Sequence, residues 1–185
     1  MSIIKRVRQF VEDECKKPSN KYGYDPYLHH FIPVVEYVKE LAKEYGADEE
    51  ILEISAWFHD IGSIMVGRED HHITSGKIAE EKLRAFGYPE DRIKRVVDCI
   101  YTHRGSQGLK PESIEAQILV EADTLSAFRD ITGLFQCAYV GEKLSREEAK
   151  KSVRQKLENK WKQLQFKKSR EIIRPKYEAA MLLLK

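Results

Sequence analysis

Residues 51–62 read Ile-Leu-Glu-Ile-Ser-Ala-Trp-Phe-His-Asp-Ile-Gly, an apolar run with an abrupt polar end. The run predicts a buried helix, which Asp48 can cap at its start. It stops at the pair His59-Asp60, and we expect Ile61-Gly62-Ser63 to break the helix. An imidazole nitrogen and a carboxylate oxygen side by side at a helix end can both reach one metal ion. By itself the pair fits a buried core histidine with a nearby aspartate equally well. A metal site is therefore predicted only if other helices carry suitable ligands.

The rest of the sequence predicts helix after helix, without the sustained alternation that strands show. The other helices are expected at about 3–16, 26–45, 71–86, 89–103 and from Pro111 past residue 123, with loops at 66–70 and 104–108. From about 126 to 185 we expect more helix with a break near Gly141, and Ser145 to Glu148 looks like a capped helix start. The tail after 145 is interpreted as one long solvated helix packed by one face, in preference to a basic nucleic-acid arm.

Composition excludes several classes of protein. The 185 residues are 34% charged and 42% hydrophobic, with a formal net charge of +2, which makes no strong case for nucleic acid or an anionic membrane as partner. Three widely spaced cysteines form no CxxC pair, so no disulfide framework is expected and a cytoplasmic location fits best. No apolar run approaches the ~18 residues of a membrane span. We therefore expect one all-α domain over 1–185, with a core at about 25–130 and C-terminal helices at about 131–185.

Three further helices each carry a metal-competent side chain on the face expected to be buried. His30 falls on the apolar stripe of its helix, whereas its neighbour His29 falls on the polar face. His103 continues the apolar stripe of residues 93–100, and Asp123 lies at helical spacing between apolar residues. A lone carboxylate on an apolar face is unfavourable unless it is paired or binds a cation. Burial of so many polar groups calls for a common partner.

Three of these motifs resemble the pattern of a known family. His30, then His59-Asp60 and then Asp123 look like the H…HD…D signature of the HD-domain superfamily of metal-dependent phosphohydrolases. The resemblance covers about residues 25–130. It implies an all-α HD-domain helical bundle with a metal site between the helices. It also implies an enzyme that hydrolyses phosphate esters or anhydrides, often of nucleotides, with one or two divalent metal ions.

A subset of this family carries two further histidines and can hold two metal ions. The first opens a helix as His-x-x-x-Gly/Ser-small, which His71 matches, and the second ends the next helix, where His103 stands. Periodicity argues differently for the first, since His72 extends the apolar stripe of its helix better than His71 does. We predict His71 as the ligand, and His72 then contacts substrate or supports the ligands from behind.

The predicted metal ligands are His30, His59, Asp60, His71, His103 and Asp123. Asp60 is also the predicted catalytic residue, because in such a site it could bridge two metals. His72, Arg104 and Arg68 are the predicted substrate contacts, the two arginines because nearby cations stabilise a transferring phosphoryl group. Nitrogen and oxygen ligands without Cys suit Mn, Fe, Co, Ni, Zn or Mg, and the number of histidines favours a transition metal.

The expected function is hydrolysis of a phosphate ester or anhydride, of a nucleotide or a small phosphorylated metabolite, by a metal-activated hydroxide. Two alternatives stay open. Some HD-fold proteins with the same ligand pattern are di-iron oxygenases, and a regulatory module could bind metal without turnover. The sequence does not identify the substrate, the general acid or the oligomeric state.

Overall fold

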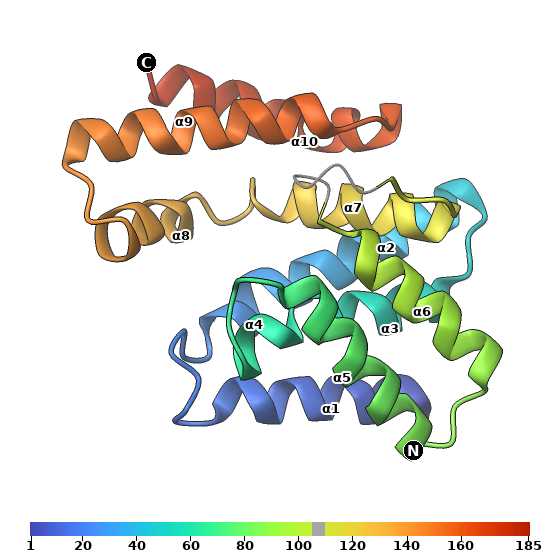
Figure 1. Cartoon of the computed structure of the whole chain (residues 1–185). Coiled ribbons are helices and arrows are strands. Elements are labelled where there is room, and N and C mark those ends of the chain that lie inside the picture. The colour runs from blue at the N-terminus through green and yellow to red at the C-terminus, as the bar shows by residue number, and fades with distance from the viewer. Residues whose placement is uncertain (105–109) are drawn as a thin grey trace.

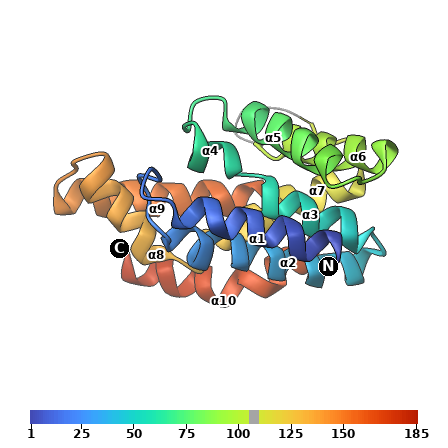
Figure 2. The ribbon, with the colours of Figure 1, turned by 90° about the horizontal axis from the view of Figure 1, so that it is seen from below.

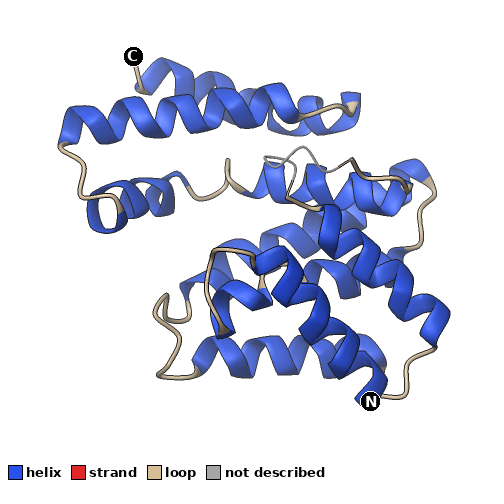
Figure 3. Ribbon diagram, viewed as in Figure 1, coloured by secondary structure: helices blue, strands red, loops and turns tan. Residues whose placement is uncertain are grey.

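The computed structural model of the chain describes residues 1–104 and 110–185 (Figure 1). In these two ranges every regular element is a helix and no strand occurs (Figure 3), which confirms the expected all-α class. The elements are α1 (Ile3–Lys16), η1 (Tyr27–Phe31), α2 (Ile32–Tyr45), α3 (Glu49–Phe58), α4 (Ile61–Met65), α5 (His71–Ala85), α6 (Glu90–Thr102), α7 (Ile114–Ser126), α8 (Ile131–Gln136), η3 (Cys137–Gly141), α9 (Arg146–Gln163) and α10 (Lys167–Leu183). No helix within the described ranges is long and apolar enough to cross a bilayer.

The apolar run of residues 51–58 forms α3, the central helix of the bundle. Every residue from Ile51 to Phe58 is buried, and α3 packs on α1, α2, α6 and α7. In the view of Figure 2, α1 lies along α3. The Asp48 side chain accepts a hydrogen bond from the Ile51 backbone N–H at 3.2 Å, which caps the helix as predicted. The polar end of α3 therefore lies in the middle of the bundle, next to helices from distant parts of the sequence.

Two expected boundaries are wrong for local reasons. Ile61-Gly62-Ser63 begins the short helix α4, and the break comes earlier, because Asp60 leaves the helical conformation at φ −113° and ψ 10°. The next difference concerns α7, which begins at Ile114 and not at Pro111. Its start is set by Ser113, whose side chain accepts a hydrogen bond from the Ala116 N–H. Most of the loop expected at 104–108 lies outside the described residues.

The helix expected at 26–45 changes its winding around His30. Residues Tyr27–Phe31 form the π-helical turn η1, in which the Ile32 N–H bonds to the Tyr27 carbonyl, five residues back. Pro33 follows at the start of α2, and it has no N–H to donate to the preceding turn. The α-helical hydrogen bonding is therefore interrupted at the turn that carries His30. Such single π-helical turns are frequent at functional sites.

The C-terminal part forms two helices instead of the one long helix expected. The predicted capping box is confirmed, since Ser145 and Glu148 satisfy each other's backbone N–H groups at the start of α9. The chain turns after Gln163, where Leu164 is buried, and α10 returns along α9. Both helices contact α7 and lie along the same side of the bundle (Figure 1). This pair, α9 and α10, is called the C-terminal hairpin below.

Candidate metal centre

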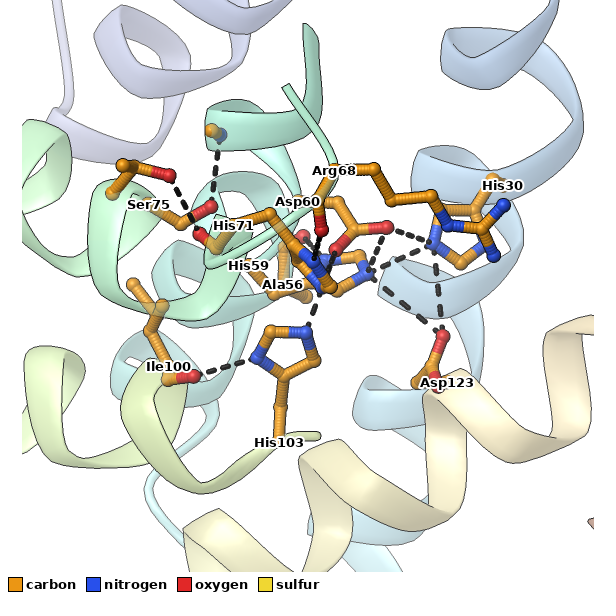
Figure 4. A network of polar contacts seen from close by, with 12 residues as sticks. His30, Ala56, His59, Asp60, Arg68, His71, Ser75, Ile100, His103 and Asp123 are labelled. Atoms are coloured by element: carbon orange, nitrogen blue, oxygen red, sulfur yellow. Dashed lines mark hydrogen bonds and ion pairs between the residues drawn. The ribbon is translucent and has the colours of Figure 1, made fainter. Parts of the chain in front are cut away.

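The structure brings all six predicted ligands into one cluster (Figure 4). Each comes from the end or the inner face of a different element or from the α3–α4 junction. His30 lies on η1, His59 ends α3, Asp60 precedes α4, His71 opens α5, His103 ends α6 and Asp123 lies on α7. His59 is fully buried and His103 is 4% exposed, whereas Asp60 and Asp123 retain partial access to solvent. The cluster is thus set in the core and open on its carboxylate side.

One half of the cluster surrounds the Oδ2 atom of Asp60. The Nε2 atom of His30 lies 2.9 Å from His59 Nε2 and 3.2 Å from Asp60 Oδ2. Asp123 closes this half, with Oδ1 at 3.6 Å from His30 Nε2 and 4.0 Å from His59 Nε2. Four ligand-type atoms from four side chains therefore face one small volume.

The other half of the cluster surrounds the second oxygen of the same carboxylate. Asp60 Oδ1 lies 3.0 Å from His71 Nε2 and 3.4 Å from His103 Nε2. The rings of His71 and His103 have centroids 5.3 Å apart. Asp60 is therefore shared, with one oxygen directed to each pair of imidazoles, as Figure 4 shows.

Backbone carbonyls hold three of the rings from behind. The Nδ1 atoms of His59, His71 and His103 lie 2.7, 2.9 and 2.6 Å from the carbonyls of Ala56, Arg68 and Ile100, respectively. A carbonyl only accepts hydrogen bonds, so each Nδ1 carries the proton. In the neutral ring Nε2 then presents a lone pair to the cluster, the arrangement typical of metal-binding histidines.

His30 reaches the same state through a hydroxyl group. Its Nδ1 lies 3.2 Å from Ser126 Oγ, and that hydroxyl donates its proton to the Asp123 carbonyl at 2.7 Å. The hydroxyl proton is thus in use, and Ser126 accepts from His30 Nδ1. In their neutral forms all four imidazoles therefore direct Nε2 lone pairs inward.

The carboxylates keep their charge in this environment. Burial raises the pKa of Asp60, but the rings of His59, His103, His30 and His71 outweigh it and hold the pKa well below its usual range. Burial likewise raises the pKa of Asp123, and Lys160 with the His30 ring lowers it to about 2. Both groups are therefore anionic at neutral pH.

The pKa of His59 is shifted in the opposite direction from those of His30 and His71. Burial lowers the pKa of His59 to about 4, so this ring is neutral at pH 7. Burial also lowers the pKa of His30 and His71, but the adjacent Asp60 carboxylate more than offsets it, and both pKa values lie above the ordinary one. A proton and a metal ion therefore compete for these two rings.

The side chains present fit a metal ion. Asp60 Oδ1 is buried next to the Nε2 atoms of His71 and His103, which in the neutral rings have no proton to donate to it. The lone pairs of His30 and His59 meet at 2.9 Å, which is unfavourable unless a proton or a cation lies between them. His30, His59 and Asp60 place ligand atoms within 4.8 Å of one another, and so do Asp60, His71 and His103. The cluster could hold a metal ion, and which ion and how many stay predictions.

The remaining predicted residues lie around this cluster. His29 is exposed and takes no part. His72 is 6% exposed, and its Nδ1 finds no partner in the described part of the chain. Arg68 is exposed and its side chain extends across the cluster in the view of Figure 4, whereas Arg104 is half-buried beside His103. The geometry therefore directs His71, and not His72, to Asp60.

Sequence analysis missed two residues that contact the cluster. Ser126 lies one turn after Asp123 on α7, so helical spacing from that carboxylate could have indicated it. Lys160 on α9 lies 3.2 Å from Asp123 Oδ2. It belongs to a tail rich in lysine, and nothing in the sequence sets it apart from its neighbours.

The helical bundle with a His/Asp cluster at its centre is the arrangement of an HD-domain protein. The family model described as HD domain matches residues 27–127, more than half of the chain. The chain therefore belongs to the HD-domain family, which confirms the membership expected from the motifs.

Three similar proteins illustrate the relationship. A ribonuclease Y from Acholeplasma laidlawii is 34% identical over 102 residues, which are 55% of this chain and 18% of that protein. This chain thus spans less than a fifth of the length of that curated relative. The crystal structure of Bacillus subtilis YpgQ in complex with ADP has a TM-score of 0.74 at 21% identity, covering 97% of this chain and 89% of the other. An HD-superfamily hydrolase from Bacillus thuringiensis has a TM-score of 0.73 at 19% identity, covering 97% and 91%. At these identities the two structures show the fold.

Proposed function

We propose that this chain is a metal-dependent phosphohydrolase that cleaves a phosphate ester or anhydride of a nucleotide or a small phosphorylated metabolite. The observation that carries the proposal is the position of Asp60, whose two oxygens face two separate pairs of imidazole lone pairs. The resemblance to ribonuclease Y supports cleavage of a phosphate bond, and the ADP complex of YpgQ supports a nucleotide as ligand.

The cluster offers two places for a divalent ion. His30, His59, Asp60 and Asp123 would hold one, and Asp60, His71 and His103 would hold the other. Ions held there supply Lewis-acid activation of water and of phosphoryl oxygens. Four imidazoles with two carboxylates favour Mn, Fe, Co, Ni or Zn over Mg.

The side chains themselves contribute orientation and charge. Carbonyls of Ala56 and Ile100 fix the rings of His59 and His103, so these ligands need no rearrangement when a substrate arrives. Arg68 on the α4–α5 loop and Arg104 after α6 are the proposed contacts for substrate phosphate oxygens. His72, buried next to His71, is the third proposed contact.

The test is hydrolysis by tag-free protein whose metal content has been measured by elemental analysis. We expect at least one equivalent of a transition metal per chain, and phosphate release from nucleotides or from p-nitrophenyl phosphate. Asp60→Ala should abolish both, while His29→Ala, with its exposed ring, should match the wild type.

Two results would contradict the proposal. Oxygen uptake by iron-loaded protein without phosphate release would favour an oxygenase. Protein that holds metal and cleaves no phosphate bond, with any of the metals named, would favour a regulatory module.

A further inference from the structure

The C-terminal hairpin delivers a cation to the metal centre. Lys160, near the end of α9, places its Nζ 3.2 Å from Asp123 Oδ2, while Asp123 Oδ1 faces His30 and His59. The lysine side chain is 31% exposed, so its ammonium group lies at the solvent-accessible edge of the cluster. No other lysine or arginine within residues 1–104 and 110–185 forms an ion pair with a carboxylate of the cluster.

The hairpin does not need this contact in order to dock. At the turn between α9 and α10, the backbone N–H groups of Gln165 and Phe166 donate to the buried Glu121 carboxylate of α7. Val153 and Leu157 of α9 are fully buried beneath the helix. A partly exposed ion pair adds at most about 1 kcal/mol to such packing. The position of Lys160 thus follows from contacts made elsewhere in the hairpin.

Aromatic packing also holds the end of α9 in place. Trp161 stacks on Tyr177 of α10 with ring centroids 4.4 Å apart and an interplanar angle of 4°. The guanidinium groups of Arg170 and Arg174 lie over the same indole ring at 6.0 and 5.4 Å. The residue after Lys160 is therefore fixed, which restricts where the lysine side chain can reach.

The charge of Lys160 is balanced by Asp123 only while the centre holds no metal ion. Asp60 and Asp123 are carboxylates with one negative charge each, and both lie close to His30 Nε2, so one divalent ion bound between them compensates both charges. The ammonium group of Lys160 is then uncompensated, beside a centre whose carboxylate charges the ion has neutralised. A lysine amine on a flexible chain with three donors is well suited to bind a phosphate oxygen as a point charge.

From this geometry we infer that Lys160 forms an anion subsite at the Asp123 end of the centre and binds a phosphate group of the substrate. The inference rests on the proposed function, because the ligand is the phosphate that the centre would cleave or its neighbour in a phosphate chain. Arg68 lies on the α4–α5 loop and Arg104 follows α6, so Lys160 on α9 supplies positive charge from a separate part of the chain.

The test compares phosphate binding by three variants of metal-loaded protein. Lys160→Met removes the charge at similar length, and Lys160→Arg keeps it. Lys168→Met is the matched control, because Lys168 lies on the same hairpin, is 34% exposed and pairs with Glu40 of α2 at 3.7 Å, outside the cluster. Titration calorimetry with inorganic phosphate and with ADP measures the affinity, elemental analysis the metal content, and circular dichroism the fold.

We expect Lys160→Met to weaken phosphate binding about tenfold or more at unchanged metal content, the effect of losing one charge-assisted hydrogen bond. Lys160→Arg should bind within about threefold of wild type, and Lys168→Met should be indistinguishable from it. Equal phosphate affinity in Lys160→Met and wild type would overturn the inference. Loss of metal from Lys160→Met would overturn it too, since the lysine would then act by positioning Asp123.

The proposed function fails by a different observation. Wild-type protein that binds phosphate through Lys160 but hydrolyses nothing would leave the subsite standing without the reaction. Wild-type protein that hydrolyses nucleotides, with Lys160→Met equal to it in phosphate affinity and KM, would keep the reaction and remove the subsite.

Discussion

Asp60 is the residue on which both halves of the centre depend. Its Oδ2 lies 3.2 Å from His30 Nε2, and its Oδ1 lies 3.0 Å from His71 Nε2. The same carboxylate raises the pKa of both rings against the opposing effect of burial. A single substitution at this position therefore alters ligation and titration together.

Asp60→Ala should lose metal binding while it keeps its helical content, because Asp60 lies in the junction between α3 and α4 and in neither helix. Elemental analysis and far-ultraviolet circular dichroism measure the two properties. His29→Ala is the control, since that side chain is exposed. Full metal occupancy in Asp60→Ala would show that the cluster does not bind metal through this carboxylate.

Metal affinity should decrease as the pH is lowered from 8 to 6. The neutral ring binds metal, and the raised pKa values of His30 and His71 make proton competition begin at a higher pH than for ordinary histidines. Each displaced proton lowers the affinity about tenfold per pH unit below the pKa. Competition with a chelating dye of known pH dependence measures the affinity. A flat profile over this range would mean that neither ring is a ligand.

The helix ends, more than the helix faces, position the centre. His59 and His103 stand at the C-terminal ends of α3 and α6, and His71 opens α5. The short helix α4 follows the C-terminal end of α3 and packs against α5. At this contact the Gly62 N–H donates a hydrogen bond to Ser75 Oγ at 2.8 Å. The approach is so close that a Cβ on Gly62 would lie 2.7 Å from the His71 carbonyl and 2.8 Å from the Ser75 nitrogen.

Gly62→Ala should destabilise the protein and disturb the half of the centre that contains His71. The clash is with backbone atoms of α5, so the helix has to move, which costs about 2 kcal/mol or more and lowers the thermal midpoint by roughly 4–8 °C. Gly141→Ala is the control, because a Cβ there meets nothing within 4 Å. Thermal unfolding with and without metal measures both effects. Equal midpoints for the two variants would show that α4 and α5 separate easily.

At the scale of the whole molecule, the cluster joins helices that are far apart in the sequence. Metal bound by side chains from η1, α5, α6 and α7 should stabilise the bundle, because an ion that binds only the folded chain lowers the free energy of the folded state. In the metal-free chain, the same cluster holds two anionic carboxylates and closely spaced lone pairs.

Metal should therefore raise the thermal midpoint of the wild type. At a free concentration a hundred times the dissociation constant the gain is about 2.7 kcal/mol, or roughly 5–10 °C for a chain of this size. Asp60→Ala should show no such rise. Differential scanning calorimetry with added metal and with a chelator measures it, and an equal rise in Asp60→Ala would place the bound metal elsewhere on the chain.

Sequence alone determined the helical class, because the period of the apolar residues is a local property that survives in any tertiary arrangement. Ser145 with Glu148 and Asp48 set helix starts that the structure confirms, since a cap needs only its own helix. The resemblance of His30, His59-Asp60 and Asp123 to the H…HD…D signature predicted the family, which the match to the HD-domain model confirms. The family resemblance also suggested Asp60 as a bridging residue, but which rings face each of its oxygens was not predictable from the sequence.

Tertiary structure alone decided which neighbours face one another across the bundle. The family resemblance had favoured His71 and the helical stripe His72, and the fold places His71 at Asp60, because His71 opens α5 where the chain enters from the α4–α5 loop. The fold also divided the C-terminal tail at Leu164 and brought Lys160 to Asp123, 37 residues away in sequence. A local pattern carries no information about such contacts, since the packing of whole helices places a side chain against a distant one.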